Sequence, residues 1–183
     1  MPTNHPRLAF SRHEAAEMLG VLAAQLRDVA ERVKEVEVKL LAWHRADEIS
    51  RRLESVPGIG PITASALVAT VCDPSQFKSG RQMAAWLGLV PQQRSSGGKE
   101  RLGGISKRGD GYIRRLLVHG ARAIVGWRKR TTSTATPWIT ALLDRRPMNV
   151  ATVAYANKLA RIAWAIMMRK ERYNPVRAYA AVA

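Results

Sequence analysis

The chain has 183 residues, of which 30 are Lys or Arg and 14 are Asp or Glu, so its formal net charge is +16. Its single cysteine, Cys72, excludes a disulfide framework and a cysteine-based metal site within this chain, which favours a reducing, cytoplasmic setting. The longest charge-free stretch, 56–72, is broken by glycine and proline and is shorter than the roughly 20 residues of a membrane-spanning helix. We therefore expect no membrane partner.

The positive charge is concentrated in the second part of the chain. Residues 1–55 hold nine basic and nine acidic residues, whereas residues 56–183 hold 21 basic and five acidic ones. A neutral segment followed by a strongly basic one indicates a polyanionic partner, and nucleic acid is the usual one. A basic solubilising surface and a ribosomal-type structural protein are the alternatives that charge alone leaves open.

After a flexible lead-in expected over 1–11, residues 12–52 have the pattern of one long helix. Apolar side chains are spaced alternately by four and three residues for about four heptads, which is typical of a coiled coil. These apolar positions are Ala15, Leu19, Leu22, Leu26, Val29, Val33, Val36, Leu40 and Trp43. We predict pairing with another helix in a homodimer or a larger assembly, and docking on the chain's own body is the alternative.

Residues 53–72 are predicted to form a helix-hairpin-helix element. The sequence VPGIGPITASAL places Gly58 and Gly60 two residues apart, before a second helix rich in small residues. Their backbone N–H groups could approach a phosphate oxygen at the start of that helix, where the helix dipole favours an anion. An ordinary helical corner would use the same glycines and prolines, so both interpretations stay open.

The stretch 88–111 combines glycine, serine and positive charge, and its glycines predict a loop or a bent hairpin. Ser95 and Ser96 are candidate nucleophiles, because nearby cations could hold the non-bridging oxygens of a phosphodiester. Phosphate binding without catalysis and a flexible linker are the alternatives. The cations predicted to contact nucleic acid are Arg94, Lys99, Arg101, Lys107, Arg108, Arg114 and Arg115.

The remaining residues, 112–173, are predicted to form a helical core, followed by a tail over 174–183. A helix begins at about Tyr112 with Asp110 as its cap, and further helices are expected over 137–143 and 150–169. The expected inner face of the first helix is Ile113, Leu116, Leu117, Gly120 and Ile124. The fold class is therefore mostly α: a long N-terminal coiled-coil helix followed by a compact helical DNA-binding domain over 53–173.

Several kinds of active site find no support in the sequence. A two-metal nuclease needs about three converging carboxylates. Beyond residue 55 the chain has only Asp73, Glu100, Asp110, Asp144 and Glu171. No GxxxxGK[ST] phosphate loop occurs, and the four histidines show no zinc spacing. We therefore expect no cofactor in this chain.

The order of these motifs resembles the C-terminal part of the IS one-ten family of insertion-sequence transposases, the bridge-RNA-guided recombinases. The resemblance covers about residues 15–175 and rests on VPGIGPITASAL, MAAWLGLVPQQRSSGGKERLGGISKRGDGYIRRLLVHGA and ANKLARIAW. It implies DNA transposition by a serine that precedes a glycine, which is Ser96 here, with Ser95 as the fallback. It also implies DNA and a guide RNA as partners, subunit association through the coiled coil, and a location at the bacterial nucleoid.

One departure from the family is equally informative. Its members begin with a RuvC-like domain whose acidic residues bind Mg²⁺, and no segment before Arg12 could form such a domain. We therefore expect Mg²⁺ only in that missing domain, and we expect this chain alone to be an incomplete enzyme. The alternative functions are a noncatalytic helix-hairpin-helix nucleic-acid-binding module from a truncated transposon gene, and a coiled-coil adaptor, which leaves the basic segment unexplained.

Overall fold

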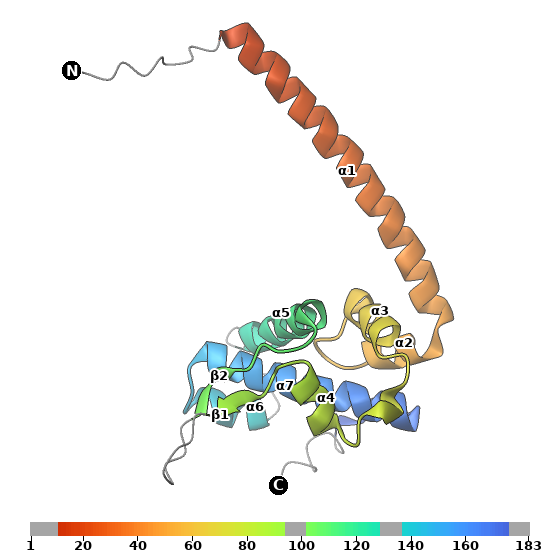
Figure 1. Ribbon diagram of the computed structural model, residues 1–183, viewed down its shortest axis with the longest axis vertical. Helices are drawn as coiled ribbons and strands as arrows, with labels where there is room; N and C mark the ends of the chain where they lie inside the picture. The colour runs from red at the N-terminus through yellow and green to blue at the C-terminus, as the bar shows by residue number, and fades with distance from the viewer. Residues whose placement is uncertain (1–10, 94–101, 129–136, 176–183) are drawn as a thin grey trace, which may run out of the picture. The chain divides into compact units, whose positions relative to one another are not determined.

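The computed structural model describes residues 11–93, 102–128 and 137–175, and these are mostly helical, as expected (Figure 1). The chain divides into two compact units, Met1–Leu40 and Leu41–Ala183. The described elements are α1 (Arg12–Ala46), α2 (Glu48–Glu54), α3 (Pro61–Thr70), the short 3₁₀ helix η1 (Pro74–Gln76), α4 (Gly80–Trp86), β1 (Pro91–Gln93), β2 (Leu102–Ile105), α5 (Gly111–Arg128), α6 (Pro137–Leu143) and α7 (Met148–Arg169).

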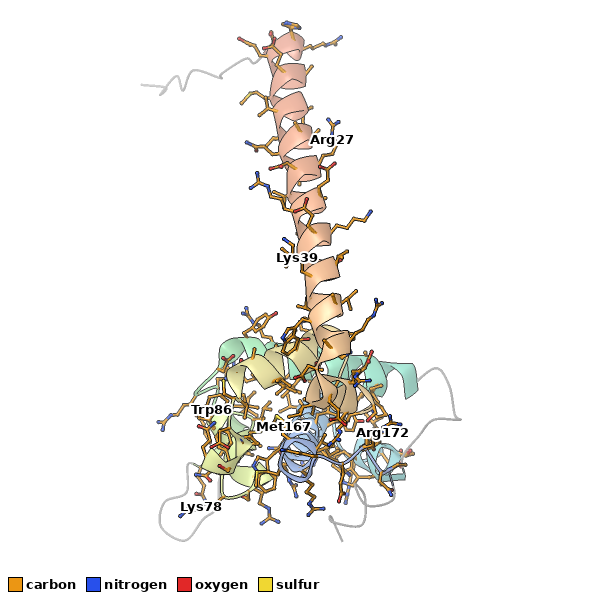
Figure 2. The ribbon with its side chains drawn as sticks, turned by 90° about the vertical axis from the view of Figure 1, so that its right-hand side faces the viewer. Arg27, Lys39, Lys78, Trp86, Met167 and Arg172 are labelled. Carbon is orange, nitrogen blue, oxygen red and sulfur yellow. The ribbon has the colours of Figure 1, made fainter. Side chains whose placement is uncertain are left out.

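Helix α1 begins with a capping box. The Ser11 backbone N–H donates to Glu14 Oε2 at 2.8 Å, and the Glu14 N–H donates to Ser11 Oγ at 3.2 Å. Figure 2 shows side chains projecting along α1, among them Arg27 and Lys39. Neither α1 nor any other helix in the described part of the chain is long and apolar enough to cross a membrane. Pairing of the apolar seam of α1 with another helix stays a prediction.

The stretch expected to be one helix over 12–52 forms two helices. Helix α1 ends at Ala46, and Asp47 takes an extended backbone conformation before α2. The carboxylate of Asp47 accepts a hydrogen bond from the Ser50 backbone N–H at 2.6 Å. Asp47 therefore acts as the N-cap of α2, and this local hydrogen bond stabilises a new helix start where α1 would otherwise continue.

Helix α7 organises the core of the second unit. Ten of its residues are buried, among them Tyr155, Leu159 and Ala163. Helices α5 and α4 make the most extensive packing against it, and α2, α6 and η1 also contact it. In Figure 1, α5 lies along one side of α7 and α4 along another, and α3 packs against α2 and α5. The unit is therefore built around a helix that follows all its partners in the sequence.

The buried face of α5 differs in part from the expected one. Ile113 and Leu117 are fully buried as expected, but Leu116, Gly120 and Ile124 are only half-buried. Ala121 and Val125 continue the buried row instead, so the row follows the spacing of four residues along the helix. Such a row is one of the natural ridges by which helices pack, and here it contacts α7.

Two glycines bring the turn between α2 and α3 against α5. Gly58 has φ +98°, a left-handed conformation that favours glycine, and a Cβ on Gly120 would overlap the Gly58 carbonyl oxygen. On the other side of this turn, the Tyr155 hydroxyl donates to the Pro57 carbonyl oxygen at 3.1 Å. The turn is therefore fixed by α5 and α7 together. Movement of the turn away from either helix would break the Gly58–Gly120 contact or the Tyr155 hydrogen bond.

This contact yields a stability prediction with a matched control in the same helix. We expect Gly120→Ala to lower the unfolding free energy by about 2 kcal/mol, the range of overpacked cores, because its methyl group would overlap backbone rather than a movable side chain. Gly126→Ala should instead be neutral or stabilising by up to about 1 kcal/mol, since its Cβ would meet only Met148 Cε at 3.7 Å. Urea titrations followed by circular dichroism measure both, and equal effects would contradict the proposed contact.

Candidate nucleic-acid interface

The sequence-predicted site falls partly outside the described residues. Ser95, Ser96, Arg94, Lys99 and Arg101 all belong to the segment 94–101, so their predicted roles stay predictions. The other predicted residues lie in the described part of the second unit. They are Gly58, Gly60, Lys107, Arg108, Arg114 and Arg115.

The two ends of the serine-containing segment are held by a pair of antiparallel strands. Strands β1 and β2 pair with Pro91 opposite Ile105 and Gln93 opposite Leu102, with an irregular register between the two pairs. The residues 94–101 connect Gln93 to Leu102. Both ends of the segment that carries the candidate nucleophiles therefore start from adjacent, hydrogen-bonded backbone.

Below the strands, the segments 86–90 and 106–110 form what we call the hairpin base. The Ser106 N–H donates to the Val90 carbonyl oxygen at 2.8 Å, and the Lys107 N–H donates to the Gly88 carbonyl oxygen at 3.1 Å. From α7, Asn157 Nδ2 donates to the Leu89 carbonyl oxygen at 3.1 Å. The two backbone hydrogen bonds join the segments of the base to each other, and the Asn157 hydrogen bond ties the base to the central helix of the unit.

Two glycines allow the segments of the hairpin base to touch backbone to backbone. Gly88 has φ +69° and Gly109 has φ +75°. A Cβ on Gly88 would overlap the backbone of Arg108, and a Cβ on Gly109 would overlap the carbonyl oxygen of Trp86. The glycines of the motif thus have a structural purpose at this point, because no other residue type fits both the conformation and the space.

Arg114 supports the hairpin base from α5. Its Nη1 donates to the carbonyl oxygens of Leu87 and Arg108, both at 3.0 Å, and the side chain is half-buried. The predicted cap is confirmed one turn earlier, where Asp110 Oδ1 accepts a hydrogen bond from the Ile113 N–H at 2.8 Å. Arg114 therefore joins both segments of the base to α5, a positioning role that the sequence did not indicate.

Exposed side chains with a different role follow the outer face of α5. Tyr112, Arg115, His119 and Arg122 are spaced by three, four and three residues and are all exposed. We call them the α5 stripe. It lies opposite the buried row of the same helix, and the exposed Lys107 and Arg108 precede its first turn. This stripe could contact the phosphates of a nucleic acid without disturbing the fold, and its period of three and four was visible in the sequence.

The two glycines of the helical corner have different environments. Gly58 packs against α5, which is the structural role that the sequence left open. Gly60 is the N-cap of α3 without a side-chain cap, and a Cβ there would meet no atom within 4 Å. The N–H groups of Ile62 and Thr63 lie in the first turn of α3, where the helix offers no carbonyl oxygen to accept their hydrogen bonds. Contact of this corner with a phosphate stays a prediction.

A serine, a histidine and a glutamate also come together at the start of the second unit. His44 Nδ1 lies 2.7 Å from Ser50 Oγ, and His44 Nε2 lies 2.9 Å from Glu54 Oε2. This is the order of groups in a hydrolytic triad. However, His44 is 3% and Ser50 0% exposed, so a substrate cannot reach the hydroxyl. The cluster therefore joins the end of α1 to α2 and has no catalytic access.

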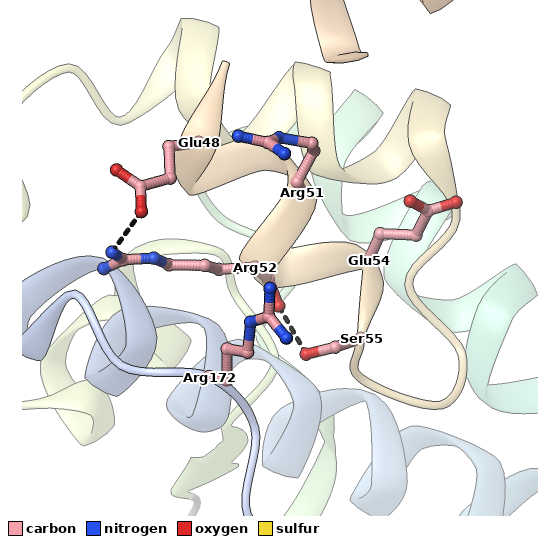
Figure 3. A pocket seen from close by; sticks show the side chains of 6 residues that line it. All are labelled: Glu48, Arg51, Arg52, Glu54, Ser55 and Arg172. Atoms are coloured by element: carbon pink, nitrogen blue, oxygen red, sulfur yellow. Dashed lines mark hydrogen bonds and ion pairs between the residues drawn. The ribbon is translucent and has the colours of Figure 1, made fainter. Parts of the chain in front are cut away.

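The outer side of α2 borders a cavity of about 440 Å³ (Figure 3). Three arginines and two glutamates line it together with Ser55, and Arg52 forms an ion pair with Glu48. The arginines are Arg51, Arg52 and Arg172. Because the charges nearly balance, this cavity is a weaker candidate for a polyanion than the α5 stripe.

Comparisons with known proteins agree with the sequence motifs. Residues 50–136 match the family described as Transposase IS116/IS110/IS902. A relative named "Probable family 20 transposase", from Pseudomonas aeruginosa, is 50% identical over 159 residues, which is 87% of this chain and 47% of the relative. The "Transposase for insertion sequence element IS1111A" of Coxiella burnetii is 46% identical over 157 residues, or 86% of this chain and 43% of the relative.

A third relative, the "Transposase for insertion sequence element IS1328" of Yersinia enterocolitica, is 44% identical over 138 residues, or 75% of this chain and 41% of the relative. These similarities identify residues 50–136 as an insertion-sequence transposase domain. That domain belongs to the Transposase IS116/IS110/IS902 family. It spans about half the length of the curated relatives that it matches.

The two adjacent arginines of α5 should respond differently to substitution. We expect Arg114→Ala to lower the unfolding free energy by about 1–3 kcal/mol, because it leaves two carbonyl groups of the hairpin base without their charged donor. Arg115→Ala, in the exposed stripe, should change it by no more than about 0.5 kcal/mol. Chemical denaturation of the two variants measures the contrast, and a stable Arg114→Ala protein would contradict the positioning role.

The second prediction concerns Lys158 in α7, which is 5% exposed and has its Nζ 4.6 Å from the centre of the Trp138 ring. Burial lowers the pKa of Lys158 to about 8 from 10.5, and the charge of Arg161 adds to the effect. Between these two values the unfolded chain binds more protons at this site than the folded chain does. The destabilisation by the buried charge is therefore complete below about pH 8 and decreases as the pH rises to 10.5.

We accordingly expect the unfolding free energy of the wild type, measured relative to Lys158→Met, to increase from pH 8 to pH 10. Methionine is similar in length and has no charge, so the difference between the two proteins reports on the ammonium group. Denaturation curves at several pH values give this difference. A difference that is constant or that falls with pH would contradict the lowered pKa.

Proposed function

We propose that this chain is the part of a DNA transposase that binds DNA and supplies a serine nucleophile for strand cleavage and rejoining. Ser96 is the proposed nucleophile, with Ser95 as the fallback. The observation that carries the proposal is the hairpin base. Two paired strands fix both ends of the serine-containing segment, and close backbone contacts with α4 and hydrogen bonds from α5 and α7 hold the base in place.

The proposed chemical step is transfer of a phosphodiester to the serine. The Oγ atom attacks phosphorus, the bond to one sugar oxygen breaks, and that oxygen leaves as a free hydroxyl end. The serine proton passes to a base that the described residues do not identify, and the leaving oxygen takes up one proton in exchange, so the number of protons is unchanged overall. Because one phosphoester bond replaces another, the covalent intermediate conserves the bond energy for rejoining. Arg94, Lys99 and Arg101 are proposed to hold the non-bridging oxygens, since phosphoryl transfer depends mainly on such stabilisation of charge.

The exposed cations are proposed to place the DNA relative to that segment. Lys107, Arg108 and the α5 stripe are continuous in the sequence with strand β2 and with the start of α5. They would neutralise phosphates without reading bases, and the corner at Gly60 would add backbone donors. Association through the seam of α1, and binding of a guide RNA, are proposals that rest on the resemblance of the motifs to the family.

Mg²⁺ is proposed to act in a RuvC-like domain outside this chain. Within residues 11–93, 102–128 and 137–175, no group of three His, Cys, Asp or Glu side chains is placed to hold a metal ion. Two of the described acidic residues have other structural uses: Asp110 caps α5, and Asp73 accepts hydrogen bonds from Ser75.

A second candidate is a noncatalytic nucleic-acid-binding module. The α5 stripe and the Gly60 corner favour it, because both could contact phosphates without any nucleophile. The two candidates differ in one measurable property, which is formation of a covalent bond between the protein and DNA.

Covalent trapping distinguishes these two functions. We would join this chain to a RuvC-like domain of its family and incubate the protein with cognate DNA and guide RNA. We expect a protein–DNA adduct that survives denaturation, is lost in Ser96→Ala and is retained in the neighbouring control Ser95→Ala. Loss of the adduct in Ser95→Ala alone would instead identify Ser95 as the nucleophile. Absence of an adduct, or its retention in both variants, would contradict the serine mechanism and favour the noncatalytic module.

A further inference from the structure

A second, more basic cavity lies away from the hairpin base. It has a volume of about 490 Å³ and is lined by the start of α4, the second half of α7 and residues 171–174. Four arginines line it, and Glu171 is the one carboxylate among its described lining residues. The arginines are Arg81, Arg161, Arg169 and Arg172. This excess of positive charge in a concave site favours an anionic occupant.

The same cavity has an apolar wall. Ile162, Ala165 and Ile166 of α7 contribute to it, and the half-buried Trp164 lies among them. Trp164 Nε1 donates to the Pro74 carbonyl oxygen at 3.1 Å, so its ring is held by η1. A free inorganic anion would need the arginines but not this wall. A nucleotide would use both, because it combines a charged phosphate with a flat base that stacks on aromatic side chains.

Lys158 also lines this cavity, although it is 5% exposed. Burial disfavours its charged form, and the nearby Arg161 adds repulsion, so the pKa of Lys158 falls to about 8. Its Nζ lies 4.6 Å from the centre of the Trp138 ring, which is not among the lining residues of the cavity. Lys158 therefore adds positive charge near the cavity, and the proposal assigns it no contact with the occupant.

The cavity is connected to the hairpin base through α4. Gly80, at the start of this helix, packs so closely on α7 that a Cβ would lie 3.0 Å from the Arg161 backbone. Trp86, at the other end, contacts Gly109 of the hairpin base. Since α4 has seven residues, about 10 Å separates its two ends. A nucleic-acid strand bound near the hairpin base would therefore need to extend only a short distance to reach the cavity.

We propose that this cavity binds one unpaired nucleotide of a single-stranded nucleic acid, with its phosphate held by the arginines and its base against Trp164. An unpaired nucleotide is required because the bases of a duplex are stacked on one another and cannot enter a concave site one at a time. The proposal rests on the proposed function only in that both involve nucleic acid. It assigns no part in strand cleavage to the cavity.

The test measures binding of fluorescein-labelled oligothymidylate and oligouridylate, each 12 nucleotides long, to the full chain. Arg81→Glu combined with Arg169→Glu should weaken binding at least about tenfold and make the log–log dependence on salt shallower by about 0.7, since one neutralised phosphate of a single strand contributes about that much. The control is Arg145→Glu combined with Arg146→Glu. These two exposed arginines lie outside the cavity, and their reversal changes the net charge equally.

Position is tested by photochemical cross-linking with 5-iodouracil at one site in each oligonucleotide. We expect adducts on Trp164 or Tyr173, and we expect Trp164→Ala to weaken binding about tenfold, as loss of one stacked base would. The DNA and RNA arms show which strand enters. Circular dichroism confirms that each variant is folded. Equal weakening by both double reversals, or adducts confined to other residues, would overturn the proposal.

Two further outcomes separate this proposal from the others. If binding appears only after residues 176–183 are removed, the chain's own terminal segment occupies the cavity, and the proposal fails for the full chain. If the transposase forms no serine adduct but Trp164 still cross-links, the cleavage mechanism fails and the nucleotide site stands. If the adduct forms and the cavity variants bind normally, the nucleotide site alone is wrong.

Discussion

The second unit depends on direct contacts between backbones, and these occur where glycine removes the side chain. Gly58 and Gly120 bring the helical corner onto α5, while Gly88 and Gly109 bring together the two segments of the hairpin base. Contact of this kind allows almost no adjustment, because the atoms that meet are carbonyl groups and Cα atoms rather than flexible side chains. It therefore fixes the distance between elements as well as their order.

That constraint explains how a motif rich in glycine, the residue with the freest backbone, can still adopt one fixed conformation at the hairpin base. The glycines of the hairpin base are used for left-handed backbone and for space, and Arg114 and Asn157 then hydrogen-bond the carbonyl groups that remain. The proposed nucleophile would benefit from such support, because catalysis by positioning fails when the supporting elements move by about an ångström. The described basic residues of the motif accordingly divide into Arg114, which holds the base, and Lys107, Arg108 and Arg115, which face solvent.

Local signals in the sequence were sufficient for most of the helices. Asp110 caps α5 as predicted, and the helix expected over 137–143 has those bounds in the structure. The break at Asp47 was not predicted, because the regular apolar pattern before it favoured one continuous helix. The local signal for a break was Asp47 itself, which caps the backbone N–H of Ser50 three residues later. Contacts between distant segments could not be predicted. Arg114 was expected to face phosphate, and only the fold places two carbonyl oxygens within its reach.

The position of α7 in the chain has a consequence for how the protein is made. The family match ends at residue 136, whereas the helix on which α2, α4, α5 and α6 pack begins at Met148. During synthesis, the apolar faces of those helices must wait for a partner that leaves the ribosome after them. Folding of this unit is therefore tied to completion of its translation. A fragment cut at the family boundary would hold the motif residues without the helix that closes their core.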